Sequence, residues 1–188
     1  MTFEITGLET GYDGWARLLI AYIRLPSGQI VRREIEDHGN AIAVLAYDPD
    51  RKTVILVQQF RAPVFYARRQ AYTLEAIAGI VEDADAQTAA RREALEEAGL
   101  ELRTLEHVAT TWTMPGISTE QMMLYLAPYR SADRVNKGGG VAADHEDISV
   151  VEMPLARLDA MMTSGEVADM KTLVLAQALK LRRPDLFR

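Results

Sequence analysis

Three glutamates at helical spacing carry the clearest chemical signal in this sequence. Residues 79–100 begin with a glycine and an acidic turn and continue into an alanine-rich segment that contains Glu93, Glu96 and Glu97. Residues three and four apart share one face of a helix, so these carboxylates crowd together, and Arg92 can relieve the charge of Glu96. Carboxylate oxygens about one helical turn apart suit a hard cation such as Mg²⁺ or Mn²⁺, which retains waters for a phosphate substrate.

The same segment resembles the Nudix box, whose pattern is Gly, five residues, Glu, seven residues, then Arg-Glu-apolar-any-Glu-Glu-any-Gly-apolar. Residues 92–100 fit the second half of that pattern at every position. In the first half, the spacing from Gly79 to Glu93 is one residue shorter than usual, and Asp85 stands where the family has Glu. The shorter spacing is typical of the GDP-mannose pyrophosphatases within the family, so it strengthens the resemblance.

Pyrophosphate cleavage requires charge neutralisation on two phosphates and a water molecule aimed at phosphorus, which two or more divalent ions roughly 3.5–4 Å apart can supply. Glu93 and Glu97 are the expected metal ligands and catalytic residues, on geometry and on the family pattern. Glu96 is a third candidate ligand, for which the alternative is an ion pair with Arg92 or Arg91. The resemblance adds the backbone carbonyl of Ala78, which no residue type could reveal.

A polar, glycine-rich stretch at residues 130–147 supplies two more candidates. Glu146 begins a Glu-Asp-Ile motif just before an apolar run. The motif resembles one in related enzymes, whose glutamate completes the metal site or helps to activate water. Asp144 resembles the proposed general base of ADP-ribose enzymes. Three consecutive glycines could provide a hinge for a lid. For both carboxylates the alternative is simple solvation.

Five residues outside the box are expected to bind substrate. Arg61 follows an apolar strand and could present its planar fork to a phosphate, with a surface salt bridge as the alternative. By resemblance, Arg33 or its neighbour Arg32 contacts substrate across a dimer together with Glu34, and Glu120 contacts the sugar side. Trp15 could stack on a base, although an aromatic residue in a hairpin more often belongs to an interface or a core.

The elements that must position these residues follow from short apolar runs and turn signals. Residues 1–40 have β character, with a hairpin of 15–25 and 29–35. Arg61 opens a loop that contains a proline. We therefore expect an N-terminal β-hairpin subdomain at 1–39 and a Nudix hydrolase domain at 40–188. Further strands are expected at 41–47, 53–60, 72–78, 105–113, 121–129 and 148–153, and helices after the acidic turn, at 154–162 and at 170–181.

Strands with few helices, the last ones near the C-terminus, indicate an α+β sandwich with helices on both sides of a mixed sheet. The resemblance implies the same architecture, a Nudix α/β/α sandwich. It also implies a homodimer in which the N-terminal hairpin is exchanged between subunits.

Composition limits the partners and the compartment. The chain has 188 residues, a formal net charge of −6 and a pI near 5.2, which argue against binding a nucleic-acid backbone. The absence of cysteine excludes disulfides, a thiolate nucleophile and a cysteine zinc site. No signal peptide and no apolar run of membrane-spanning length is evident, so we expect no membrane partner and a cytoplasmic location.

The resemblance therefore implies Mg²⁺-dependent hydrolysis of a nucleoside-diphosphate sugar, with GDP-mannose giving GMP and mannose 1-phosphate. An ADP-ribose pyrophosphatase, releasing AMP and ribose 5-phosphate, is the alternative within the family. A third possibility is a non-catalytic Nudix-fold sensor of nucleotide sugars, but such a protein would lack the paired glutamates. The sequence does not distinguish guanine from adenine.

Overall fold

The computed structural model describes residues 2–82, 85–141 and 147–188 of the chain. The backbone separates into two compact units: the first consists of Met1–Ala41 with Thr110–Met122, and the second of Ile42–Ala109 with Met123–Arg188. The strands are β1 (Glu4–Asp13), β2 (Arg17–Arg24), β3 (Ile30–Asp37), β4 (Ala41–Asp48), β5 (Thr53–Phe60), β6 (Tyr72–Glu75), β7 (Ile77–Ile80), β8 (Glu106–Trp112), β9 (Gln121–Pro128) and β10 (Ser149–Pro154). The helices are α1 (Ala62–Arg68), α2 (Ala86–Ala98), α3 (Leu155–Ser164) and α4 (Met170–Arg182), with short 3-10 turns at Ser131–Asp133 and Pro184–Phe187.

The first unit is built on a three-stranded antiparallel sheet in the order β1-β2-β3. The expected hairpin is confirmed as β2 and β3, joined by a turn in which Gly28 has a φ of 87° that favours glycine. Strand β1 adds a third member to the sheet. The edge of β3 also holds residues 117–119, because the Glu36 N–H donates to the Ile117 carbonyl at 2.8 Å and the Thr119 N–H donates to the Glu36 carbonyl at 2.9 Å.

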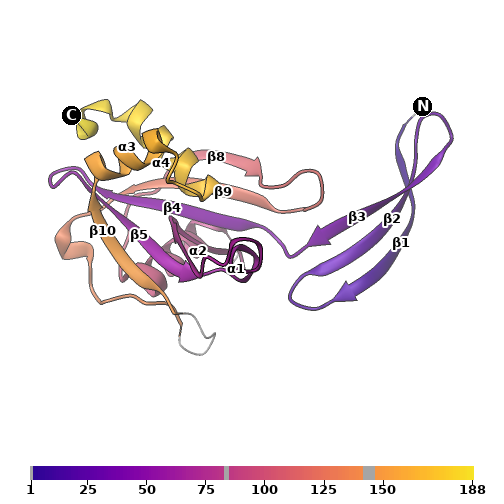
Figure 1. The fold of residues 1–188 in the computed structure, drawn as a ribbon, viewed down its shortest axis with the longest axis horizontal. Helices are drawn as coiled ribbons and strands as arrows, with labels where there is room; N and C mark the ends of the chain where they lie inside the picture. Colours follow the sequence, from indigo (N-terminus) through magenta and orange to yellow (C-terminus); the bar gives the residue numbers. More distant parts are fainter. Residues whose placement is uncertain (1, 83–84, 142–146) are drawn as a thin grey trace. The chain divides into compact units, whose positions relative to one another are not determined.

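The second unit has a sheet in the order β10-β5-β4-β9-β8, to which β6 is added through β5 and β7 through β4. Figure 1 shows α1 and α2 on one face of this sheet and α3 and α4 on the other. The predicted α/β/α sandwich is thereby confirmed. No helix in the described ranges is long and apolar enough to cross a membrane.

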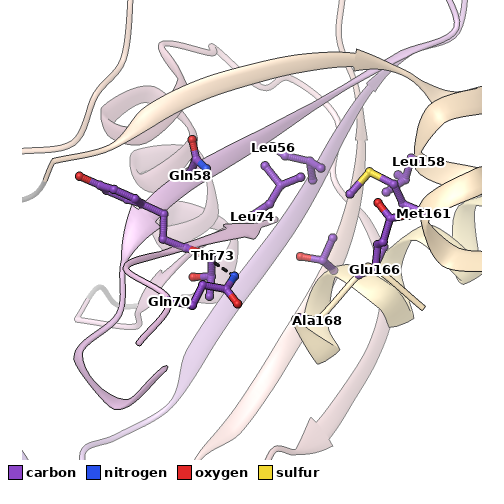
Figure 2. A pocket seen from close by; sticks show the side chains of 12 residues that line it. Leu56, Gln58, Gln70, Thr73, Leu74, Leu158, Met161, Glu166 and Ala168 are labelled. Atoms are coloured by element: carbon purple, nitrogen blue, oxygen red, sulfur yellow. Dashed lines mark hydrogen bonds between the residues drawn. The ribbon is translucent and has the colours of Figure 1, made fainter. Parts of the chain in front are cut away.

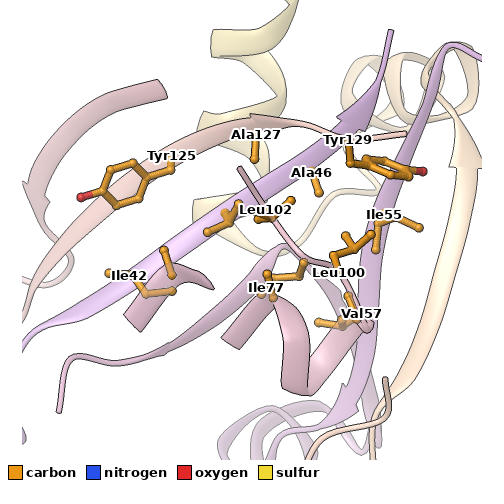
Figure 3. Close-up of a cluster of buried hydrophobic side chains, with 14 of the residues drawn as sticks. Ile42, Ala46, Ile55, Val57, Ile77, Leu100, Leu102, Tyr125, Ala127 and Tyr129 are labelled. Carbon is orange, nitrogen blue, oxygen red and sulfur yellow. The ribbon is translucent and has the colours of Figure 1, made fainter. Parts of the chain in front are cut away.

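Alternation along β5 explains how one sheet carries helices on both faces. Ile55 and Val57 are fully buried in a cluster that includes Ala94 and other alanines of α2 (Figure 3). Leu56, between them in sequence, points to the opposite face, where it lines a cavity with Leu158 of α3. The alanines let α2 lie close to the sheet, and this close approach places the acidic residues of the helix beside β7.

Two details differ from the sequence expectations. The expected proline-containing loop after Arg61 is wrong, because residues Ala62–Arg68 form helix α1 and Arg61 is its N-cap. Pro63 lies in the first helical turn, where a missing N–H costs nothing, so here proline begins a helix. The single strand expected at 72–78 is divided into β6 and β7, which pair with different neighbours.

Candidate active site

Helix α2 is defined at both ends by the residues that its sequence suggests. The Asp85 carboxylate accepts hydrogen bonds from the Gln87 and Thr88 N–H groups, each at 2.9 Å, and from the Thr88 hydroxyl at 2.8 Å. The Thr88 bonds lower the pKa of Asp85. Gly99 ends the helix with a φ of 69° and donates its N–H to the Leu95 carbonyl. Asp85, which stands at the glutamate position of the box, is therefore a helix cap.

Glu97 connects helix α2 to strand β7, which precedes it in the chain. Its side chain is only 2 % exposed, and its Oε2 accepts a hydrogen bond from the Ala78 N–H at 3.2 Å. Two of the expected metal ligands, the Glu97 carboxylate and the backbone of Ala78, are thus in direct contact. A buried carboxylate on a backbone donor is held in place before any ligand binds.

Glu93 lies against Gly79, the glycine that opens the box. A Cβ at Gly79 would overlap the Glu93 carboxylate, so only glycine leaves room for this side chain. Arg92 donates to Glu93 at 2.8 Å, to Glu96 at 3.2 Å and to the Ile80 carbonyl at 3.2 Å. The ion pair between Arg92 and Glu96, weighed as the alternative to metal binding by Glu96, is therefore present.

The oxygen donors at this site fit a hard divalent cation, although they form an incomplete set within the described residues. Across residues 2–82, 85–141 and 147–188, no group of three or more histidine, aspartate or glutamate side chains is arranged to hold a metal. What these residues offer is two box carboxylates, Glu93 and Glu97, whose oxygens are ligands of the kind that Mg²⁺ prefers. The contact that the structure gives at Ala78 is through its N–H, so its carbonyl stays a ligand expected from the resemblance. The remaining candidates, Asp144 and Glu146, lie outside the described residues.

Arg61 is held by a buried carboxylate. Glu75, at the end of β6, has a side chain that is 4% exposed. Its carboxylate accepts from Arg61 Nε at 2.9 Å and from Arg61 Nη2 at 2.8 Å. This bidentate pair fixes the guanidinium plane. Glu75 raises the pKa of Arg61, and the charge of Glu97 also contributes, so Arg61 lies within electrostatic reach of the box.

A second cation reaches the same carboxylate from the start of α4. Lys171 Nζ donates to Glu75 Oε2 at 2.5 Å and to Asp169 at 3.0 Å. Asp169 caps α4 by accepting from the Thr172 N–H at 3.0 Å, and the Thr172 hydroxyl accepts from the Ala76 N–H at 2.6 Å. The first turn of α4 is thereby tied to the chain between β6 and β7.

Arg61, Glu75, Asp169 and Lys171 all line a pocket of about 710 Å³. Its lining combines cations, carboxylates, amides and a few apolar side chains: Arg61, Pro63, Val64, Arg68, Gln70, Thr73, Glu75, Ala168, Asp169 and Lys171. A volume of this size is within the range of small-molecule sites.

A smaller cavity of about 140 Å³ lies on the α3 side of β5 (Figure 2). Figure 2 shows Leu56, Leu74 and Met161 around it, and Gln70 at its edge. Gln70, which donates to the Tyr72 carbonyl at 2.9 Å, also lines the larger pocket.

Glu75 stays ionised in this setting. Burial raises its pKa, but the hydrogen bonds and charges of Arg61 and Lys171 outweigh that effect and lower the pKa to about 2. Because Asp169 also pairs with Lys171, the four groups together are neutral. Their value to an anionic ligand therefore depends on where the donors point and not on a surplus of positive charge.

The substrate-binding candidates of the first unit are distributed as follows. Trp15 is 77 % exposed and stacks on the His38 ring, with centroids 4.8 Å apart and planes at 24°. Glu120 Oε2 lies 2.7 Å from His38 Nε2 and can accept its hydrogen bond. Arg33 and Glu34 lie exposed on β3, where Arg33 donates to the Arg32 carbonyl at 2.8 Å. Trp15 and Glu120 thus meet through His38.

Sequence reasoning did not identify three residues whose charged or polar side chains make close contacts in the structure: Glu75, Lys171 and His38. Glu75 did carry a signal, because it is a lone carboxylate in the otherwise apolar stretch 74–78 and so requires a buried partner. Lys171 follows the Asp169 cap by two residues, but nothing local connects it to β6. Both nitrogens of His38 face carboxylates, Glu36 and Glu120, and no spacing rule predicts that contact.

Comparison with known proteins assigns the chain to a family. Residues 37–174 match the model of the NUDIX domain. The chain belongs to the Nudix family. Among curated relatives of this Nudix protein, the GDP-mannose pyrophosphatase of Cronobacter sakazakii (strain ATCC BAA-894) is 39% identical over 158 residues, which are 82% of this chain and 82% of that protein. That of Salmonella arizonae is 34% identical over the same shares, and that of Escherichia coli O1:K1 / APEC is 33% identical over 157 residues, 82% and 81%.

A solved structure, described as an ADP compounds hydrolase, superposes on this Nudix chain with a TM-score of 0.78. The alignment covers 98% of this chain and 96% of that one at 15% identity, so it shows a shared fold. The predictions of a Nudix fold and of a Nudix pyrophosphohydrolase are confirmed. Nudix hydrolases generally require a divalent metal ion.

Proposed function

We propose that this enzyme hydrolyses the pyrophosphate bond of a nucleoside-diphosphate sugar in the presence of Mg²⁺. The preferred substrate is GDP-mannose, cleaved to GMP and mannose 1-phosphate, because curated relatives that share 82% of the chain carry that activity in their names. The observation that carries the proposal is the contact between the buried Glu97 carboxylate and the Ala78 backbone, beside Glu93. These are the groups that the box needs for a metal-bound diphosphate.

In this reaction a water oxygen attacks one phosphorus while the bond from that phosphorus to the bridging oxygen breaks, and the water proton passes to a base. Mg²⁺, when bound, would polarise the phosphate oxygens and lower the pKa of a water molecule. Glu93, Glu97 and the Ala78 carbonyl would hold the cation. Arg61 would bind a phosphate oxygen, and its guanidinium is already fixed by Glu75.

The base that accepts the proton stays a prediction. Asp144 and Glu146 remain our candidates, and Glu96, whose carboxylate is paired with Arg92, remains a candidate metal ligand. Trp15 remains the candidate platform for the base of the nucleotide: it is 77 % exposed, and His38 stacks on its ring. Arg33, Glu34 and Glu120 also remain proposed substrate contacts.

A homodimer and a cytoplasmic location stay predictions from the sequence. Light scattering after size-exclusion chromatography would test for the homodimer.

Product analysis tests the function directly. The purified enzyme would be incubated with GDP-mannose and, separately, with ADP-ribose, with Mg²⁺, with Mn²⁺ or with EDTA, and the nucleotides would be separated by anion-exchange chromatography. We expect GMP from GDP-mannose, a slower release of AMP from ADP-ribose, and no product with EDTA. Hydrolysis in ¹⁸O-labelled water would show which phosphorus the water attacks.

The same assay decides among the alternatives. Faster cleavage of ADP-ribose would replace our substrate assignment by the ADP-ribose pyrophosphatase. Binding of nucleotide sugars without any turnover would favour a non-catalytic sensor and would overturn the proposal.

A further inference from the structure

Glu75 connects two parts of the chain that are far apart in sequence. Its Oε1 accepts from Arg61 Nε at 2.9 Å and from the Thr73 hydroxyl, and its Oε2 accepts from Arg61 Nη2 at 2.8 Å and from Lys171 Nζ at 2.5 Å. Arg61 stands at the start of α1 and Lys171 in the first turn of α4, 96 residues from Glu75. One carboxylate thus sets the positions of both cations.

Both cations line the 710 Å³ pocket. Lys171, whose side chain is 11% exposed, donates to Glu75 and Asp169, which leaves the third N–H of its ammonium group for a ligand. Arg61 uses Nε and Nη2 for Glu75, and within the described residues no acceptor is recorded for its Nη1. The Arg61 side chain is 41% exposed, whereas that of Glu75 is 4% exposed. The carboxylate is therefore the buried anchor and the guanidinium is the part that a ligand can reach.

Fixing long cationic side chains before a ligand arrives favours binding. Arginine and lysine lose much rotamer freedom when an anion immobilises them, and a group that is already ordered does not incur that loss on binding. Glu75 remains charged well below neutral pH because its pKa is about 2, so this ordering holds under all ordinary conditions.

We propose that Glu75 is a positioning residue of the active site, which holds Arg61 and Lys171 so that both can donate to phosphoryl oxygens of the substrate in this pocket. The inference rests on the proposed function, because it assumes a diphosphate substrate. Glu75 itself does not touch the substrate. It acts through the two cations, and its removal leaves them without a common reference.

Glu75→Gln tests the proposal with an almost isosteric change. A glutamine keeps one oxygen acceptor but places an NH₂ group where the other oxygen was. In either orientation that NH₂ meets donors: Arg61 Nη2 and Lys171 in one case, Arg61 Nε and the Thr73 hydroxyl in the other. The bidentate hold on Arg61 is therefore lost whichever way the amide turns.

The chain offers a matched control in Glu152. This carboxylate on β10 accepts from Arg51, from the Thr53 hydroxyl at 3.0 Å and from the Tyr129 hydroxyl at 2.9 Å, at the end of β5 opposite to Arg61. It lines neither of the two pockets described above. Glu152→Gln therefore removes an ion-paired carboxylate of similar chemistry without disturbing the candidate site.

The measurements are kcat and KM for GDP-mannose, together with the inhibition constant of inorganic pyrophosphate, for the wild type and both variants. We expect Glu75→Gln to lower kcat/KM by roughly ten- to a hundredfold and to weaken inhibition by pyrophosphate. A change of this size corresponds to the loss of one hydrogen bond to a charged group. We expect Glu152→Gln to stay close to the wild type in both. Glu75→Asp, which keeps the charge but is one methylene shorter, should lie between wild type and Glu75→Gln.

A folded Glu75→Gln enzyme whose kcat/KM and pyrophosphate inhibition match those of Glu152→Gln would overturn the proposal. If Glu75→Gln does not fold, Glu75→Asp decides, because wild-type kinetics in that variant would equally contradict a positioning role. If the wild type hydrolyses no nucleoside-diphosphate compound, the proposed function fails. Calorimetric binding of pyrophosphate to wild type and Glu75→Gln would then still test the inference, and equal affinities would reject it.

Discussion

The side chain of Glu93 occupies the space that a Cβ at Gly79 would need. Gly79 belongs to β7 and is not among the glycines with positive φ, so its backbone conformation is open to any residue. The requirement for glycine is therefore steric. It comes from a carboxylate on the next helix and not from the backbone conformation of Gly79.

Gly79→Ala is expected to displace the Glu93 carboxylate and to lower kcat by about a hundredfold or more, because a small misplacement of a reacting group costs that much. The fold should persist, since Glu93 can swing outward. The measurement is steady-state kinetics with saturating Mg²⁺. Gly116→Ala provides the control: a Cβ there meets nothing within 4 Å and its φ is not positive, so activity should be unchanged. Wild-type kinetics for Gly79→Ala would show that the position of Glu93 does not matter.

Glu97→Gln should lower kcat by at least about a hundredfold, since loss of even an outer-shell partner of a metal ligand costs 10–100-fold. The amide retains an oxygen for the Ala78 N–H, so the unfolding midpoint should change little. Kinetics over a Mg²⁺ titration would be compared with those of Glu101→Gln, which alters an exposed glutamate just after α2. Normal turnover by Glu97→Gln would remove Glu97 from the proposed ligand set.

The elements that sequence reasoning placed well are those with local causes. Asp85 and Gly99 end helix α2 through contacts with residues two to five positions away, so composition and spacing suffice to find them. The same holds for β5, whose bounds Thr53–Phe60 are those expected from the sequence. The wrong expectation of a loop at Pro63 also has a local cause, because proline is common both in loops and in the first turn of a helix.

The contacts that escaped prediction have no local cause. Glu75 and Lys171 are 96 residues apart. They meet only because β6 pairs with β5 and α4 packs on the face of that sheet that α1 and α2 leave open. Glu120 and His38 are 82 residues apart and likewise require the finished fold. A sequence can indicate that a buried carboxylate needs a cation, but it does not say which one.

Stability at low pH should depend on Glu75. Its pKa is lowered from 4.5 to about 2, so its ion pairs stabilise the folded state fully above the ordinary value, and that contribution is lost as the pH falls from there toward 2. The contribution is roughly 3 kcal/mol. Urea unfolding of wild type and Glu75→Gln should differ by a constant amount above about pH 5 and converge below it. A difference that stays constant down to about pH 3 would contradict the lowered pKa.

His38 should titrate above its ordinary pKa. Its Nδ1 contacts Glu36 and its Nε2 lies 2.7 Å from Glu120, and only the protonated ring can donate at both nitrogens. Burial lowers the pKa of His38, but the two carboxylates outweigh it and raise the pKa above 6.5. The contact is therefore complete below the ordinary value and weakens as the pH rises through the raised one.

Residues 117–119 pair with the edge of β3 next to this contact. We therefore expect the protection factor of the Thr119 N–H, which is its intrinsic exchange rate at a given pH divided by the observed rate, to fall as His38 loses its proton. Trp15 stacks on the ring, so its fluorescence, measured in a Trp112→Phe background, should follow the same titration. His38→Asn should abolish the fluorescence transition. A His38 proton NMR titration with a midpoint at or below 6.5 would show that the two carboxylates do not stabilise the charged ring.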